Sequence, residues 1–192
     1  MTEKKQGTLL VPAIGACLTG LLYCAAHLLN DWLFKAFEVS GHINLVYLPA
    51  FIRLASVLIL GLLWGTVGTA IGGLLLLYWS QDANVWIALA NIGVSASVAA
   101  VSVLLLQHLA KRRLSVTRLA DLLQLSVLYA LLNALIHHLL WTAVDPAQLM
   151  YPTQVLLMVL GDIHGVVIGA LLLRWIAHKT KLTQRLRNQT MD

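Results

Sequence analysis

The stretch TQVLLMVLGDIHGVVIGALLLRW, residues 153–175, is apolar apart from a few polar side chains around Asp162 and at its two ends. A bilayer core about 30 Å thick is crossed by about 20 helical residues, so this stretch predicts a transmembrane helix. Five further ranges have the same apolar character: residues 8–29, 43–63, 65–79, 85–107 and 119–141. We therefore predict an all-α integral membrane protein, a bundle of six transmembrane helices with a broken or short second and third span.

The composition of the 192-residue chain supports this fold class. Hydrophobic residues make up 59% and charged residues 11%, against roughly half and a quarter in soluble domains. The few polar residues cannot cover a water-exposed surface, so the apolar excess faces the lipid bilayer. The net charge of +5 comes from short basic clusters between apolar runs, so we expect no nucleic-acid partner. We assign residues 1–178 to one membrane domain and residues 179–192 to a basic cytoplasmic tail.

The basic residues also predict an orientation. They cluster before the first span, between the fourth and fifth spans, and after the sixth, and all three positions fall on one side of the membrane. The loops on the other side hold one basic residue, Lys35, and four acidic residues, Asp31, Glu38, Asp82 and Asp145. The positive-inside rule then places both termini in the cytoplasm and the chain in a bacterial cytoplasmic (inner) membrane as a multi-pass protein. All tryptophans fall at span ends, as interfacial residues do: Trp32, Trp64, Trp79, Trp86, Trp141 and Trp175.

The second and third spans carry helix-breaking residues. Pro49 favours a helix that starts at that residue after an extended Leu48, which makes the second span a broken helix. Several glycines at residues 61–73 permit a tight hairpin between the second and third spans on the inner side. The outer loop at residues 30–44 is a candidate surface helix.

Two ionisable side chains lie within the predicted spans at matching depth. Counting residues places Arg53 about 10 Å and Asp162 about 13 Å from the outer surface. A charge in hydrocarbon costs roughly 2.5 to 3.5 kcal/mol even on the mildest scale, so each needs a partner or a function. One interpretation is a structural ion pair between the second and sixth spans. The other is an anion or carboxylate ligand bound by Arg53, with Asp162 positioning the guanidinium.

Other polar residues share this outer half of the membrane and predict an outward-facing pocket. They are Asn91 in the fourth span, and Asn133 and His137 in the fifth, which lie side by side because they are four residues apart. His164 follows Asp162 by two residues, about 200° around a helix, so we rank it after Asp162 as a site residue.

A glycine stripe marks the sixth span. Gly161, Gly165 and Gly169 recur at a spacing of four, which allows another backbone to approach this helix closely. Asp162 borders the stripe, so the neighbouring segment is expected to reach it.

Three short motifs resemble the membrane-associated sensor domains of bacteria, of the first, MASE-type class. They are Tyr47-Leu48-Pro49-Ala50, Arg118-Leu119-Ala120-Asp121-Leu122 and Leu160-Gly161-Asp162-Ile163-His164-Gly165, and the likeness covers roughly residues 43–175. The resemblance implies a sensory membrane module. Family members usually carry more spans and a cytoplasmic signalling enzyme, whereas this chain carries a short basic tail, so signalling would use a separate protein partner. The motifs imply no particular ligand.

Two alternative functions remain open. An outward polar pocket and a broken second span also suit a transport module, similar to the six-span substrate-binding subunits of energy-coupling-factor uptake systems, which work with an energising subunit. Ser95 and His164 resemble the serine and histidine of rhomboid proteases, but Ala96 replaces the glycine that normally follows the serine. We therefore expect no enzyme activity. No metal or cofactor motif is present, and a homo-oligomer is a further possible assembly.

Overall fold

The computed structural model describes residues 3–40, 43–79, 84–115, 118–144 and 151–189, with side chains from residue 9 to residue 180 apart from residues 39 and 40. Its helices are α1 (Glu3–Phe34), α2 (Pro49–Trp79), α3 (Val85–Ala110), α4 (Leu119–Val144) and α5 (Pro152–Gln189). Within the described residues these five helices are long and apolar enough to cross a membrane. The protein therefore has an all-α, membrane-type fold. Asp82, Asp145 and residues 190–192 of the predicted tail lie outside the described residues.

The helix ends carry the residues that favour them. Pro49 and Pro152 are the first residues of α2 and α5, where the missing N–H of proline costs no hydrogen bond. The side chain of Asn84 caps α3, since its Oδ1 accepts a hydrogen bond from the backbone N–H of Trp86 at 3.1 Å. α3 ends before Lys111, which has a left-handed backbone with φ of 52°.

The outer segment between α1 and α2 is not the surface helix considered above. α1 continues to Phe34 and is followed by one 3-10 turn, Lys35–Phe37. Two short strands then pair antiparallel, β1 (Glu38–Ser40) with β2 (Ile43–Asn44). Two paired strands form backbone hydrogen bonds over a few residues, whereas a helix of only a few residues is marginally stable because its first turn is costly to form.

Most of the two predicted spans at residues 43–63 and 65–79 falls in α2, so the described residues contain five long helices and the predicted count of six spans is not confirmed. α2 starts at Pro49, as the proline predicts, and is interrupted at Gly61, whose φ of 83° is accessible mainly to glycine. After this break the chain comes back on itself. A Cβ built on Gly65 would lie 2.5 Å from the Cα of Val57, although eight residues of continuous helix span about 12 Å.

Contacts with α1 show how the two halves of α2 run. Near the start of α1, Gly15 meets Leu60, which adjoins the break. Eight residues further along α1, Tyr23 meets both Arg53 in the first half of α2 and Gly72 in the second half. Both halves therefore extend from the break in the same direction along α1, and the break is a reversal of the chain.

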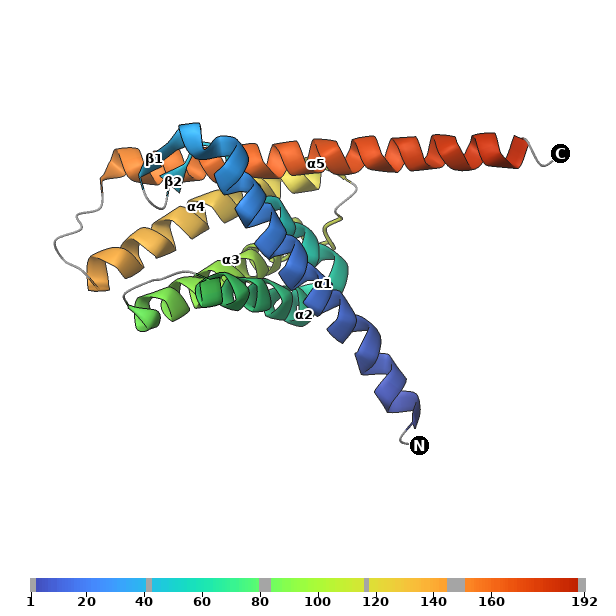
Figure 1. Cartoon of the computed structure of the whole chain (residues 1–192), viewed down its shortest axis with the longest axis horizontal. Coiled ribbons are helices and arrows are strands. Elements are labelled where there is room, and N and C mark those ends of the chain that lie inside the picture. The colour runs from blue at the N-terminus through green and yellow to red at the C-terminus, as the bar shows by residue number, and fades with distance from the viewer. Residues whose placement is uncertain (1–2, 41–42, 80–83, 116–117, 145–150, 190–192) are drawn as a thin grey trace.

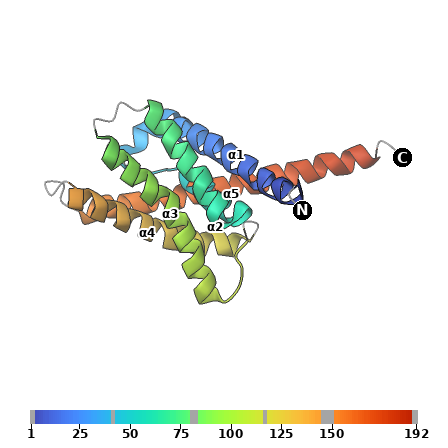
Figure 2. The same cartoon turned by 90° about the horizontal axis from the view of Figure 1, so that it is seen from below.

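This arrangement gives the molecule two distinct ends. Figures 1 and 2 show both chain termini at one end of the long axis, with the extended C-terminal part of α5 projecting beyond the bundle. The β1–β2 hairpin, the last turns of α4 and the first turns of α5 lie at the other end (Figure 1). We call these the terminal end and the hairpin end.

The glycine stripe of α5 receives the segment that leads from β2 into α2. A Cβ at Gly161 would overlap the carbonyl oxygen of Asn44, and one at Gly165 would overlap that of Tyr47. The backbone N–H of Tyr47 also donates to the carbonyl of Gly161 at 3.0 Å. Residues 44–48 therefore lie directly on α5, which fixes Tyr47 and the start of α2 beside Asp162.

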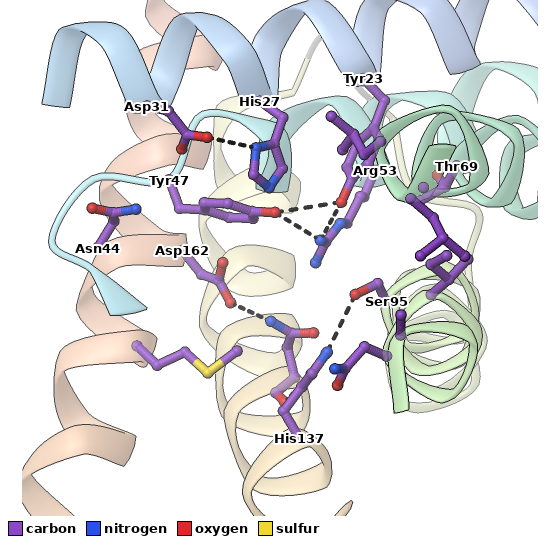
Figure 3. Close-up of a pocket in the computed structure, with 18 of the residues that line it drawn as sticks. Tyr23, His27, Asp31, Asn44, Tyr47, Arg53, Thr69, Ser95, His137 and Asp162 are labelled. Atoms are coloured by element: carbon purple, nitrogen blue, oxygen red, sulfur yellow. Dashed lines mark hydrogen bonds and ion pairs between the residues drawn. The ribbon is translucent and has the colours of Figure 1, made fainter. Parts of the chain in front are cut away.

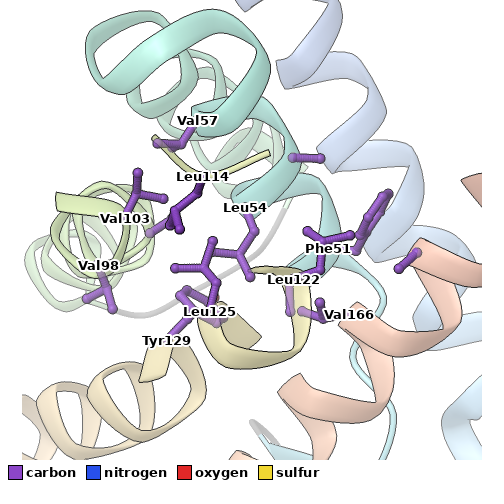
Figure 4. Close-up of a cluster of buried hydrophobic side chains, with 14 residues drawn as sticks. Phe51, Leu54, Val57, Val98, Val103, Leu114, Leu122, Leu125, Tyr129 and Val166 are labelled. Atoms are coloured by element: carbon purple, nitrogen blue, oxygen red, sulfur yellow. The ribbon is translucent and has the colours of Figure 1, made fainter. Parts of the chain in front are cut away.

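An apolar core joins α2, α3, α4 and α5 (Figure 4). Its centre contains Leu54, Val98, Leu125 and Val166, each at most 1% exposed. Tyr129 belongs to the same core and is fully buried, so its phenol is held in place by packing. Many other large apolar side chains are exposed along all five helices, where lipid would cover them.

Candidate ligand-binding site

A cavity of about 810 Å³ lies between α1, α2, α3, α4 and α5. Its lining includes Asp31, Trp32, Lys35 and Glu38, which are exposed, so the cavity reaches the surface beside the last turn of α1 and the start of β1. The inner lining is polar, and Figure 3 shows side chains from several helices converging there. Five of the six predicted site residues line it: Arg53, Asp162, Asn91, Asn133 and His137.

Arg53 is 3% exposed and is held by three tyrosines. Its Nη1 donates to the hydroxyl of Tyr129 at 2.8 Å, and its Nη2 donates to Tyr23 at 2.5 Å and to Tyr47 at 3.0 Å. The guanidinium also lies 5.2 Å from the ring centroids of Tyr23 and Tyr47, a cation–π distance. Burial raises the pKa of Tyr47 well above its ordinary value in spite of the opposing charge of Arg53. The hydroxyls of the three tyrosines orient the guanidinium through these hydrogen bonds.

Asp162 does not contact Arg53. The described side chains form two ion pairs within 4.0 Å, His27–Asp31 and Arg112–Asp121, so the structural ion pair between Arg53 and Asp162 is absent. Asp162 is 1% exposed, and its Oδ2 accepts a hydrogen bond from Nδ2 of Asn133 at 2.8 Å. The second interpretation also needs correction, because the tyrosines rather than Asp162 position the guanidinium.

Two further side-chain contacts join α3 to α4 inside the cavity, Ser95–His137 and Asn91–Trp141. Nε2 of His137 lies 3.2 Å from the hydroxyl of Ser95, and Nδ1 of His137 lies 2.9 Å from the carbonyl oxygen of Asn133. The indole N–H of Trp141 donates to Oδ1 of Asn91 at 2.9 Å. These contacts give the wall formed by α3 and α4 a defined shape.

His164 is the predicted residue that does not line the cavity. Its side chain is exposed, and its Nδ1 lies 2.8 Å from the carbonyl oxygen of Leu45. The difference of about 200° from Asp162 accounts for this position, because one helix face turns toward the cavity and the other away from it. The serine and histidine of the protease comparison are therefore apart, since the imidazole beside Ser95 belongs to His137.

The three tyrosines were missed by sequence reasoning. One signal was available for Tyr129, which lies four residues before Asn133 and eight before His137 and so shares their helix face. A second signal is general, because a buried phenol needs a hydrogen-bond partner and a mid-membrane arginine needs acceptors. Tyr23 and Tyr47 lack such a pattern, since their positions depend on the path of α1 and on the segment before α2.

Several buried polar atoms at the cavity have no hydrogen-bond partner among the described residues. They include Nε of Arg53 and Oδ1 of Asn133. An unpaired buried polar atom costs about 1 to 3 kcal/mol, more if the group is charged, so such atoms are rarely left without a partner. Among the described side chains no cluster of three or more metal-ligating residues is present.

Comparisons of the chain with protein-family profiles, with curated proteins and with solved structures found no match.

Proposed function

We propose that this protein is an integral membrane sensory module of the MASE-like kind, which binds a small ligand carrying an anionic group at Arg53 and acts through a separate protein partner. The observation that carries the proposal is a buried guanidinium, held in place by three tyrosine hydroxyls, at the wall of a cavity that opens to the surface. The motif resemblance at residues 43–175 supports the sensory role.

The electrostatics of Arg53 favour an anionic ligand. A buried charge without a counter-charge is costly, and no carboxylate among the described residues lies within 4.0 Å of this guanidinium. Two of its nitrogens are taken by the tyrosines, but Nε has no partner. An anion in the cavity would supply the missing charge and accept a hydrogen bond from Nε.

An uptake subunit would use the same kind of cavity, so the partner separates the two functions. We propose a signalling partner, because α5 carries Asp162 in the cavity wall and extends to Gln189 at the terminal end. Ligand contact and partner contact would then lie on one rigid element. Copurification of an ATPase with an energising membrane subunit would instead favour transport.

We also propose that the chain crosses a bacterial inner membrane six times, with the two halves of α2 as separate crossings and both termini in the cytoplasm. The chain reversal at Gly61, the position of both termini at one end (Figure 1) and the basic loop between α3 and α4 support this topology. An even number of crossings puts the termini on one side, whereas five would separate them.

Cysteine labelling tests this topology in a background in which Cys17 and Cys24 are replaced by serine. Ala83→Cys should react with an impermeant thiol reagent in intact cells, whereas Leu63→Cys and Ala177→Cys should react only in inside-out vesicles. Leu63 and Ala177 are exposed in the structure, so burial would not hide them. Labelling of Ala177→Cys in intact cells would rule out cytoplasmic placement of the C-terminal end.

Ligand binding is tested with the purified full chain and a panel of carboxylates, amino acids, phosphate and sulfate, by thermal stabilisation and calorimetry. At least one member should bind, and Arg53→Gln should weaken that binding by at least about tenfold, since a charge-assisted bond is lost. The matched control is Arg174→Gln, which removes the same charge from the exposed surface of α5 and should bind like the wild type. Equal affinity of Arg53→Gln and the wild type for every member would refute the anion site.

A further inference from the structure

We infer that the cavity is built for a zwitterion, a molecule with one carboxylate and one ammonium group, such as an α-amino acid. The carboxylate would bind at Arg53, and the ammonium would bind between Asp162 and Asn133. This inference rests on the proposed function, because it names the ligand class of the same site.

The acidic side of the cavity also has hydrogen-bonding capacity that the described residues do not fill, as the side around Arg53 does. Asp162 is buried, and one of its oxygens accepts the single hydrogen bond that this carboxylate makes within the described residues, from Asn133. The amide oxygen of Asn133 has no hydrogen-bond partner among the described residues, although that residue is 1% exposed. Two acceptor oxygens on adjacent side chains match an ammonium group, which has three N–H donors and no acceptor.

The separation of Arg53 from Asp162 is what selects a ligand with two charges. In a closed ion pair the two groups would satisfy each other and need no ligand. Here both line one cavity but lie beyond the 4.0 Å limit of an ion pair. A purely anionic ligand would supply a counter-charge to Arg53 and leave Asp162 without one. A zwitterion supplies a counter-charge to both residues at once.

The rest of the cavity limits the size and polarity of the ligand. Leu76, Ile92 and Met158 add apolar lining beside the polar groups. The volume of about 810 Å³ lies in the upper part of the usual range for small-molecule sites, which runs from roughly 300 to 1,000 Å³. An amino acid with an apolar side chain therefore fits without any rearrangement of the helices.

The first arm of the test uses wild-type protein only. Each of the twenty standard L-amino acids is compared by calorimetry with two analogues that keep its side chain, one without the ammonium group and one without the carboxylate. For leucine these are 4-methylpentanoate and 3-methylbutylamine. At least one amino acid should bind about tenfold or more tightly than both of its analogues.

The second arm assigns the two charges to residues. Asp162→Asn keeps the side-chain shape and can still accept the hydrogen bond from Asn133, so it should weaken binding of that amino acid about tenfold and leave the des-amino carboxylate unchanged. Arg53→Gln should weaken both compounds, and Arg174→Gln neither. If one of these variants does not fold, the comparison of amino acids with their analogues in the wild type decides the test.

The outcomes separate this inference from the proposed function. If des-amino carboxylates bind as tightly as the amino acids and depend on Arg53, the zwitterion is excluded while the anion site stands. If Asp162→Asn folds and binds the amino acid like the wild type, the ammonium position is wrong. If neither amino acids nor carboxylates bind, and phosphate and sulfate also fail, both proposals are excluded.

Discussion

The protein contains two arginine–aspartate combinations at opposite ends of the bundle, and they differ in whether the two charges meet. Arg112, just after α3, donates to both carboxylate oxygens of Asp121 in the first turn of α4, at 2.8 and 2.5 Å. The backbone N–H of Ser115 donates to the same carboxylate at 3.0 Å. Arg53 and Asp162 share a cavity but make no contact.

The closed combination has an evident structural purpose. Asp121 is fully buried while Arg112 is 39% exposed, so the guanidinium covers the carboxylate and remains partly hydrated. Together with Ser115 it fixes the short connection between α3 and α4. A bidentate pair of this kind satisfies its own donors and acceptors and has little capacity left for a ligand.

In the open combination, Arg53 and Asp162 do not satisfy each other, so both keep hydrogen-bonding capacity for a ligand. Its arginine is oriented by phenols, its aspartate by an amide, and each charge faces the cavity without a counter-charge in contact. Buried charges are usually paired, so a protein that already closes one such pair but separates the other has a reason to keep the second open. The proposed ligand binding would supply that reason.

The largest predicted effect comes from disturbing the packing of residues 44–48 on α5, which positions Tyr47 and the start of α2 and so keeps Arg53 and Asp162 apart. Gly165→Leu would place a side chain where the carbonyl of Tyr47 now lies, which would displace residues 44–48 and the start of α2. Overpacking of this kind costs about 1 to 3 kcal/mol or more, so we expect the melting temperature in detergent to fall by roughly 5 to 10 °C.

Gly93→Leu is the matched control for that substitution. Gly93 also lies in a membrane helix, but a Cβ built on it meets nothing within 4 Å. This variant should melt within about 2 °C of the wild type. If Gly165→Leu and Gly93→Leu melt alike, the contact between α5 and residues 44–48 does not stabilise the fold.

The sequence indicated which of these groups lie near one another better than it indicated their hydrogen-bond partners. Apolar runs and helical rise are local properties, so residue counting placed Arg53 and Asp162 in the same outer half, and both do line one cavity. Whether they touch depends on the direction each helix face points, which is set by packing. The segment at residues 44–48 brings Tyr47 to Arg53, and no local pattern indicates that.

In the fold, too, features set by local sequence were predicted and features set by packing were not. Pro49 and the glycines around Gly61 signalled a helix start and a tight reversal, because these residues have unusual backbone requirements. The β1–β2 hairpin was missed, since its strands are two and three residues long and carry no alternating pattern over such a length. The predicted count of six spans is not confirmed, because the second and third spans are joined at Gly61 within α2.

The smallest predicted effect is the energetic coupling within the open combination. The closed combination is measured with Arg112→Gln, Asp121→Asn and the double variant, and the open one with Arg53→Gln, Asp162→Asn and their double variant. All are compared by melting temperature without ligand. Contacting charges lose their shared bond once, so the two losses for Arg112 and Asp121 should add up to clearly more than the loss in the double variant.

For Arg53 and Asp162 the losses should be nearly additive, with a difference of about 2 °C or less, because no bond joins them and only a longer-range attraction across the cavity remains. Each single variant still costs stability, since the tyrosines or Asn133 lose a charged partner. Adding the amino acid that the wild type binds should then create coupling where there was none, because the ligand connects both residues. Strong coupling without ligand, equal to that of Arg112 and Asp121, would mean that the two charges meet in solution, and the cavity would then hold a closed ion pair rather than an open site.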